Sequence, residues 1–302
     1  MKIAVCQPVN VSQANRLRLG AGEVPLRFVD AAAPCDAQIM FGNPETDVVV
    51  ANRALRWLQL GSVGFGEYLG LDWSRADGAA QVTNLAGFFS HPVAETALAG
   101  ILALRRGIDR LTLLRTRGEW LGDPVRQMLG LVTGSRVVLF GRGAINGRLA
   151  EMLSPFHCDI TTFGRDFAAD ALDAALTCAD IVVATVPHSP ATVGLFDAAR
   201  IGRMRPGAVF CNLGRGSLVD EVALAAALTS GRLAGAVIDV TTDEPLPDGH
   251  AFWTTPNTIL TQHSGGGTAD EVDRMIDWFL DNLARFRECR PLRGSIDFAR
   301  GY

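Results

Sequence analysis

The chain of 302 residues has few features that would suit it to nucleic acid, zinc or a membrane. No run of lysines and arginines forms a basic patch, and the formal net charge is -4 at pH 7, so we expect no nucleic-acid partner. The six cysteines form no C-x-x-C pair, and no histidine lies at zinc-ligand spacing from one, so we expect no metal site. No apolar stretch reaches the roughly 18 residues that cross a bilayer, so no membrane association is expected.

The scattered cysteines are typical of a protein in a reducing compartment. Several lie inside apolar runs, as Cys211 does, and are expected to be buried as small hydrophobic residues. Unpaired thiols favour the cytoplasm. The amino-terminal segment 1–6 is short and apolar and is followed by Pro8, which predicts a first β-strand rather than a secretory signal.

The length predicts two domains of ordinary size, without internal repeats. From residue 136 onwards, short apolar runs alternate with helical patterns. The predicted strands cover residues 137–140, 160–163, 181–186, 208–212, 236–240 and 258–260, and the predicted helices cover 144–153, 168–178 and 221–228. Continuous apolar strands between helices indicate a parallel sheet that is covered on both faces.

The rest of the chain is less regular. Residues 91–106 predict a long helix with Pro92 in its first turn, and residues 268–288 predict an amphipathic helix near the carboxyl end. The segments 47–51 and 55–60 are expected to form short buried elements.

A glycine-rich turn follows the first strand of the predicted parallel sheet. It consists of Gly141, Arg142, Gly143, Ala144 and Ile145. Two glycines at this spacing permit a tight turn and the close approach of a pyrophosphate, which the amino terminus of the next helix then binds. Asn146 replaces the third glycine of the usual fingerprint, and Gly147 comes one residue late. Such a turn is often only structural, but within this alternation of strands and helices it predicts a dinucleotide-binding site.

The end of the second strand bears on the choice of dinucleotide. NAD-binding sites normally have a carboxylate there, which accepts hydrogen bonds from the ribose hydroxyls. This chain has Gly164 in that position and Arg165 beside it, and an arginine can pair with the 2'-phosphate of NADP. We therefore expect NADP to be preferred, with NAD possible. The alternative is that Arg165 is a solvated turn residue neutralised by Asp166.

Three polar stretches follow buried strands in the last third of the chain. They read R-G-x-x-V-D-E from Arg215, D-V-x-x-x-E-P-L-P around Glu244, and T-x-H ending at His263. This combination resembles the D-isomer-specific 2-hydroxyacid dehydrogenases, which include glyoxylate and hydroxypyruvate reductases. The resemblance runs from about Leu58 to the carboxyl end and is strongest over 141–263, whereas the first fifty residues show little resemblance.

The resemblance implies that Arg215, Glu244 and His263 are catalytic. Arg215 has a planar cationic fork that suits the carboxylate and adjacent carbonyl of a 2-keto acid. His263 would be the general acid in reduction, and Glu244 would hydrogen-bond its imidazole and favour the protonated form. A lone Arg-Gly, Glu-Pro or histidine is usually structural, but the three together at this spacing are not. The other histidines lack such company and are interpreted as ordinary: His91, His157, His188 and His250.

Further positions carry over from the resemblance. Asp239 matches the aspartate that binds the nicotinamide carboxamide. The loops that flank the cofactor match Val186, Pro187, Leu213 and Gly214. The loop whose backbone N–H groups hold the substrate carboxylate matches Ser62, Val63 and Gly64. Gln262 replaces the proline that usually precedes the histidine, so we expect a less rigid turn before His263.

The family fold implies an α/β protein: a Rossmann-type, doubly wound nucleotide domain over 91–274 and a smaller flavodoxin-like substrate domain over 1–90, completed by 275–302. Family members are usually homodimers, and the segment 111–131, which includes Trp120, is a candidate projecting segment that contacts the second subunit. Two alternatives stay open, a catalytically silent NAD(P)-binding regulator and a phosphite dehydrogenase. A formate dehydrogenase is disfavoured because those enzymes have glutamine where Glu244 stands.

Overall fold

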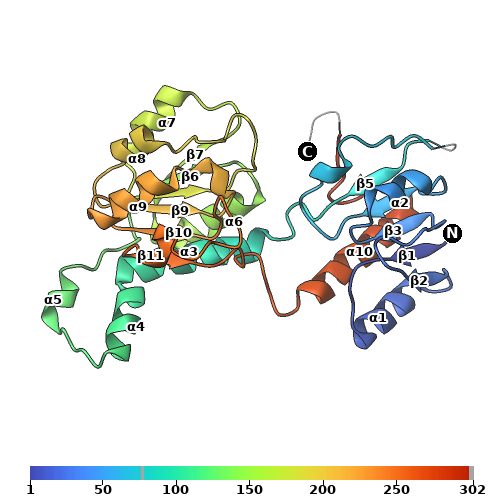
Figure 1. Ribbon diagram of the computed structural model, residues 1–302, viewed down its shortest axis with the longest axis horizontal. Helices are drawn as coiled ribbons and strands as arrows, with labels where there is room; N and C mark the ends of the chain where they lie inside the picture. Colours follow the sequence, from blue (N-terminus) through green and yellow to red (C-terminus); the bar gives the residue numbers. More distant parts are fainter. Residues whose placement is uncertain (76–77, 299–302) are drawn as a thin grey trace. The chain divides into compact units, whose positions relative to one another are not determined.

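The computed structural model describes residues 1–75 and 78–298, which divide into two compact units (Figure 1). The first unit combines Met1–Phe88 with the segment that begins at Thr268, and the second spans Phe89–Gly267. The chain therefore leaves the first unit once and returns to complete it. None of the helices in the described ranges is long and apolar enough to cross a bilayer.

The described residues of the first unit form a five-stranded parallel sheet with the order β2-β1-β3-β4-β5. This is the strand order of flavodoxin-like folds, as predicted. The strands are β1 (Ile3–Val5), β2 (Leu26–Phe28), β3 (Ile39–Phe41), β4 (Trp57–Gln59) and β5 (Gln81–Thr83). The helical elements are α1 (Val11–Ala21), α2 (Thr46–Ala51), the 3-10 helix η1 (Gly66–Tyr68) and α10 (Glu271–Arg287).

Helix α10 brings the carboxyl-terminal segment into the core of the first unit. Its buried apolar side chains recur on one face, at Met275, Ile276, Phe279 and Leu283. The Phe279 ring stacks on Phe41 with the ring centroids 4.6 Å apart and on Trp57 at 5.4 Å. The buried Asn282 Nδ2 donates to Gln59 Oε1 and to Arg293 O, each at 2.9 Å. These contacts make α10 part of the sheet's packing.

The described residues of the second unit form a six-stranded parallel sheet with the order β11-β10-β9-β8-β6-β7. The strands are β6 (Arg136–Phe140), β7 (Asp159–Phe163), β8 (Ile181–Ala184), β9 (Val209–Asn212), β10 (Gly235–Ile238) and β11 (Thr258–Leu260). All six were predicted, but β8 and β10 end two residues early because the backbone there leaves the ladder for the loops of the site. The strand order reverses between β6 and β8, which is where doubly wound sheets bind ligands.

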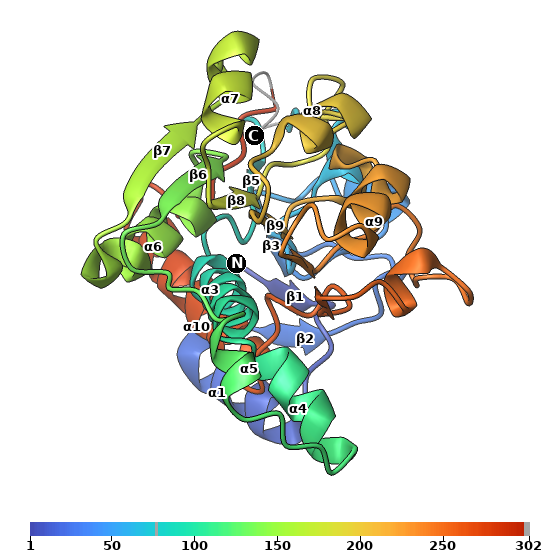
Figure 2. The same cartoon turned by 90° about the vertical axis from the view of Figure 1, so that its left-hand side faces the viewer.

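Helices cover both faces of this second sheet. Helices α3 (Ser90–Arg106) and α6 (Ala144–Leu153) pack side by side on one face (Figure 2). The other face carries α7 (Ala169–Leu176), α8 (Ala198–Arg203) and α9 (Glu221–Thr229). Helix α8 was not predicted, since among its six residues only Ile201 is buried. The α/β class of both units is as predicted.

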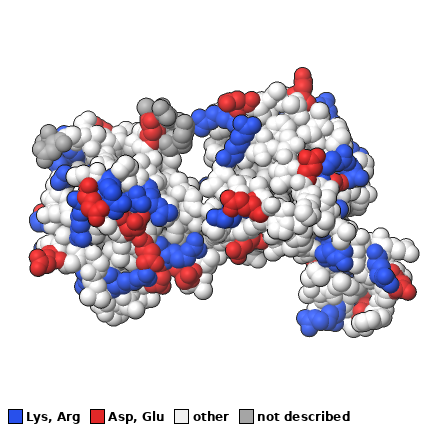
Figure 3. Space-filling view, turned by 180° about the vertical axis from the view of Figure 1, so that it is seen from behind, with Lys and Arg blue, Asp and Glu red and all other residues white. Residues whose placement is uncertain are grey.

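An extended arm follows α3 in the second unit. It contains α4 (Ile108–Thr116) and α5 (Asp123–Arg126), and it stands away from the sheet and its covering helices (Figure 1). Its side chains include Trp120, which is 94% exposed. Elsewhere the surface is mixed in charge: on the face drawn in Figure 3, basic and acidic side chains of the described residues are interspersed over both units.

We predict that Phe279→Ala lowers the free energy of unfolding of the first unit by about 3–5 kcal/mol, because it removes a buried ring and leaves a cavity against Phe41 and Trp57. Urea denaturation measures the change. The control is Leu19→Ala on α1, whose side chain is 83% exposed. It should change the value by less than about 0.5 kcal/mol. Equal losses in the two variants would show that α10 is not part of the core.

Candidate active site

The three predicted catalytic residues follow strands that end side by side. In the ladders, Ile238 pairs with Asn212 on one side and with Leu260 on the other, and these three residues end β10, β9 and β11. Arg215 follows Asn212 by three residues and His263 follows Leu260 by three. Because parallel strands in register end at one edge, their loops begin together there.

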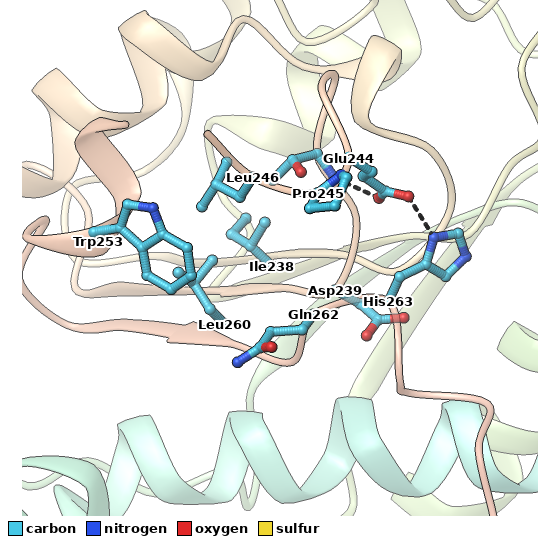
Figure 4. Close-up of a pocket in the computed structure, with 10 residues that line it drawn as sticks. Ile238, Asp239, Glu244, Pro245, Leu246, Trp253, Leu260, Gln262 and His263 are labelled. Atoms are coloured by element: carbon cyan, nitrogen blue, oxygen red, sulfur yellow. Dashed lines mark hydrogen bonds and ion pairs between the residues drawn. The ribbon is translucent and has the colours of Figure 1, made fainter. Parts of the chain in front are cut away.

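A hydrogen bond joins two of these residues. His263 Nδ1 lies 2.7 Å from Glu244 Oε2 (Figure 4). The backbone N–H of Thr241 donates to the other oxygen, Glu244 Oε1, at 3.0 Å. A carboxylate can only accept, so Nδ1 of His263 is the donor, and Nε2 is the ring nitrogen that remains for another partner.

Electrostatics keeps Glu244 ionised. Partial burial on its own raises the pKa of the Glu244 carboxyl. The hydrogen bonds from His263 and from the Thr241 backbone, together with the nearby positive charges of His263 and Arg215, outweigh burial and hold that pKa below its ordinary value. The positive charge of Arg215 is the smallest of the causes that lower this pKa. Arg215 is exposed, and its Nη1 donates to Gly214 O at 2.6 Å.

Gly216 brings the loop of Arg215 against the loop of Glu244. A Cβ at position 216 would lie 1.9 Å from the carbonyl carbon of Thr241 and 2.2 Å from the nitrogen of Thr242. Backbone therefore occupies the space that any side chain at 216 would need. The glycine of the Arg-Gly pair is thus the point at which the backbone of this loop lies against the backbone of Thr241 and Thr242.

The turn before His263 differs from our expectation of a looser segment. Gln262 and His263 both have a φ of +54°, a region closed to proline, whose ring holds φ near -65°. A proline at position 262 could not adopt this turn. Hydrogen bonds hold it: His263 N donates to Asp239 O at 2.6 Å, and Thr261 Oγ1 and Gly265 N donate to Asp239 Oδ1 at 2.6 Å and 2.9 Å.

The glycine-rich turn fits the phosphate end of a dinucleotide. Gly143 precedes α6, and a Cβ built on it would meet open space, so a ligand can approach this backbone closely. Asn146 is buried, and its Nδ2 donates to Gly141 O at 2.9 Å. In the described ranges, Asn146 Oδ1 and Thr185 Oγ1 are buried without a hydrogen-bond partner. Such atoms normally have one, so they suit a polar group bound at this turn.

The flanking loops meet beside the same turn. A Cβ on Gly214 would lie 2.6 Å from Val186 O, and one on Gly141 would lie 3.2 Å from the Val186 side chain. The loops after β8 and β9, with Pro187 and Leu213, are thus brought together at the switch point. By contrast, Ser62, Val63 and Gly64 lie in the first unit, after β4. There, Ser62 Oγ donates to Gly64 O at 2.7 Å, and Asn84 Nδ2 donates to Val63 O at 2.8 Å.

In the structure, the side chain of Arg142 lies beside the end of β7. Phe140 pairs with Phe163 in the ladder, so Gly141 and Gly164 leave adjacent strands together. The side chain of Arg142 crosses this edge: its Nη2 donates to Thr162 O at 3.4 Å, and a Cβ on Gly164 would lie 2.8 Å from its Cδ. Arg142 and Arg165 are both exposed. The position of the usual ribose-binding carboxylate is therefore next to two arginines.

Other residues near the site were missed from the sequence. A pocket of about 460 Å³ lies beside His263 and Glu244 and is lined in part by Leu246, Trp253 and Leu260 (Figure 4). Two histidines interpreted as ordinary also have partners. His188 Nδ1 lies 2.8 Å from Ser217 Oγ, and His250 Nε2 lies 3.4 Å from Glu221 Oε2. The signal that could have found these contacts is that both partners, Ser217 and Glu221, belong to the motif that begins at Arg215.

The fold and site are those of a dinucleotide-binding α/β enzyme, and similarity to known proteins identifies its family. The family described as "D-isomer specific 2-hydroxyacid dehydrogenase, NAD binding domain" matches residues 98–265. The chain is 32% identical over 222 residues to a hydroxyphenylpyruvate reductase from Plectranthus scutellarioides, covering 70% of this chain and 69% of that protein. It is 27% identical over 218 residues to glyoxylate/hydroxypyruvate reductase A from Salmonella newport, covering 69% and 68%.

A solved structure has the same fold. It is a D-isomer specific 2-hydroxyacid dehydrogenase from Xanthobacter autotrophicus, in complex with NADPH and MES. It superposes with a TM-score of 0.79 at 24% identity, covering 100% of this chain and 99% of that one. The chain belongs to the D-isomer specific 2-hydroxyacid dehydrogenase family and is an NAD(P)-dependent oxidoreductase.

We predict that keto-acid reduction by Glu244→Gln declines at a lower pH than reduction by the wild-type enzyme. The carboxylate, whose own pKa is lowered, stays ionised and stabilises the protonated imidazole of His263, whereas an amide supplies no charge. Profiles of kcat/KM against pH for wild type and variant measure the shift. Superimposable profiles would show that the charge of Glu244 does not act on His263.

Proposed function

We propose that this enzyme interconverts a small 2-keto acid and its 2-hydroxy acid, as a reductase of the glyoxylate and hydroxypyruvate type. The observation that carries the proposal is the 2.7 Å hydrogen bond between His263 and Glu244, beside which the loop of Arg215 packs against the loop of Glu244 at Gly216. This arrangement combines a proton donor with a carboxylate binder. The relatives named for hydroxypyruvate and hydroxyphenylpyruvate reduction support the substrate class.

Each of the three residues has a distinct part in the proposed reaction. Arg215 binds the substrate carboxylate and polarises the adjacent carbonyl with its guanidinium. His263 gives the proton on Nε2 to the carbonyl oxygen in reduction and takes it back in oxidation. Glu244 holds Nδ1–H, which fixes the orientation of the ring and stabilises its charge. The backbone N–H groups of Ser62, Val63 and Gly64 are proposed as further substrate-binding groups.

The residues of the second unit are proposed to hold the cofactor, which supplies the hydride when bound. Its pyrophosphate would bind at the amino terminus of α6, next to Gly143, Ala144 and Ile145. Asp239 would bind the nicotinamide carboxamide through Oδ2, because Oδ1 already accepts from Thr261 and Gly265. The residues proposed to flank the cofactor are Gly141, Val186, Pro187, Leu213 and Gly214.

The hydrogen-bonded pair of His263 and Glu244, called the dyad below, argues against a catalytically silent regulator. A protein that only senses nucleotide has no need of a hydrogen-bonded imidazole and carboxylate at its strand ends, and here both are held by further hydrogen bonds. Nothing in the site favours phosphite over a keto acid. We therefore propose one function.

We also propose that the enzyme works as a homodimer in the cytoplasm. The arm after α3 exposes a series of apolar side chains: Leu113 (58%), Trp120 (94%), Met128 (48%) and Leu131 (61%). An apolar surface of this kind on a projecting segment suits burial against a second copy. All six cysteines lie in the described part of the chain as free thiols, which favours a reducing compartment.

We predict that His263→Ala and Arg215→Ala each lower kcat/KM for glyoxylate or hydroxypyruvate reduction by roughly two to four orders of magnitude, the range for a lost general acid or charge anchor. Steady-state kinetics tests this, with cofactor binding measured by fluorescence to show that the variants still fold. The matched control is His91→Ala, which changes a histidine at the start of α3. Near-normal reduction in either site variant would refute the proposed mechanism.

We predict a preference for NADPH over NADH. Arg142 and Arg165 supply positive charge at the end of β7, and Gly164 supplies no carboxylate to repel a 2'-phosphate. A charge-assisted pair is worth roughly 1.5–3 kcal/mol, or about 10- to 150-fold in kcat/KM. Arg165→Ala should lose efficiency with NADPH and change little with NADH.

The companion variant is Gly164→Asp, which should move the ratio towards NADH. It adds a carboxylate for the ribose hydroxyls and also displaces the Arg142 side chain, whose Cδ would lie 2.8 Å from the new Cβ. The measurement is kcat/KM for both cofactors in each variant. A wild-type enzyme that prefers NADH, or equal loss with both cofactors in Arg165→Ala, would overturn the assignment.

A further inference from the structure

The carboxylate of Glu221 contacts both ends of the loop that carries Glu244. Glu221 is the first residue of α9, and its side chain is 15% exposed. Its Oε1 accepts from Thr242 N at 2.8 Å, and its Oε2 lies 3.4 Å from His250 Nε2. Glu244 lies between these two points in the chain. A single side chain therefore spans the loop from residue 242 to residue 250.

The far end of this loop is anchored in the core. His250 Nδ1 accepts from Phe252 N at 3.2 Å, where the histidine caps the 3-10 helix η4 (Ala251–Trp253). Phe252 is buried in the core of the second unit. Because Nδ1 accepts, the proton of the neutral ring is on Nε2, the nitrogen that faces Glu221. In this tautomer, Nδ1 accepts from Phe252 N and Nε2 carries a proton that faces Glu221.

The near end of the loop is linked directly to Glu244. Thr241 N donates to Glu244 Oε1 at 3.0 Å, and Thr242 N donates to Glu221. The same two residues pack against Gly216, beside Arg215. A shift of this short backbone segment would change the position of Glu244 relative to both Arg215 and His263.

A purely helical role does not explain the position of the Glu221 side chain. An acidic residue in the first turn stabilises a helix through its dipole. Helix α9 already has an N-cap, since Asp220 Oδ1 accepts from Ala223 N at 2.9 Å. The carboxylate of Glu221 instead bonds to a loop that is distant in sequence.

We propose that Glu221 is a positioning residue for catalysis, which holds the Thr241–Thr242 backbone and thereby aims Glu244 at His263. The inference rests on the proposed function of the dyad. It assigns the last residue of the R-G-x-x-V-D-E motif a part in the reaction that involves no contact with substrate.

Two variants and one control test the proposal. Glu221→Ala removes both loop contacts and should lower kcat by roughly tenfold, while the dissociation constant for NADPH is unchanged. Its pH profile for reduction should move to lower pH, as in Glu244→Gln. Glu221→Gln keeps the acceptor for Thr242 and should stay within roughly threefold of wild type, because it alters only the longer contact to His250. The control is Asp170→Ala, which removes an exposed first-turn carboxylate from α7 in the same unit and should retain wild-type kcat.

A double-mutant cycle separates this proposal from the proposed function. If Glu221 acts through Glu244, then Glu221→Ala in a Glu244→Gln background causes little further loss of kcat. Losses that multiply would overturn the positioning role while leaving the dyad intact. An unmoved pH profile in Glu221→Ala would overturn it as well. Wild-type activity in Glu244→Gln alone would instead refute the function of the dyad.

Discussion

The candidate site depends on one close contact between backbones. Gly216 has no side chain, and Thr241 and Thr242 lie where one would stand. Strands β9, β10 and β11 end in register, so their loops start at one edge, and this contact then brings Arg215 towards Glu244. The hydrogen bond from His263 completes the group. A larger residue at 216 would have to push the two loops apart, so the glycine is a requirement of the site and not only of the turn.

Much of the second unit could be predicted from the sequence. Its strands are continuous apolar runs, because both faces of the sheet are covered, and such runs stand out between helical patterns. Helices α3, α6, α7 and α9 of this unit, and α10 of the first unit, were placed to within a few residues, since each has a clear apolar face or lies between clear strands. The spacing of Arg215, Glu244 and His263 predicted their proximity because residues just beyond parallel strands share one edge.

The rest depended on contacts that sequence spacing does not encode. The strands of the first unit are only three residues long, too short for a period to be recognised, and α8 buries a single apolar residue. The role of Arg142 at Gly164 follows from the register of β6 with β7. The two contacts of Glu221 follow from the path of a loop that begins twenty residues later. The turn at Gln262 was expected to be loose, but its backbone hydrogen bonds to Asp239 could not be foreseen.

The central claim is that one group, the imidazole of His263 held by Glu244, serves as acid in reduction and as base in oxidation. The most direct test is the pH dependence of kcat/KM for the wild-type enzyme in both directions, from about pH 5 to 9, the range in which a histidine changes its charge. We expect opposed profiles, with reduction lost as the pH rises and oxidation lost as it falls, each with an inflection within this range. Profiles that decline on the same side, or that are flat in both directions, would contradict it.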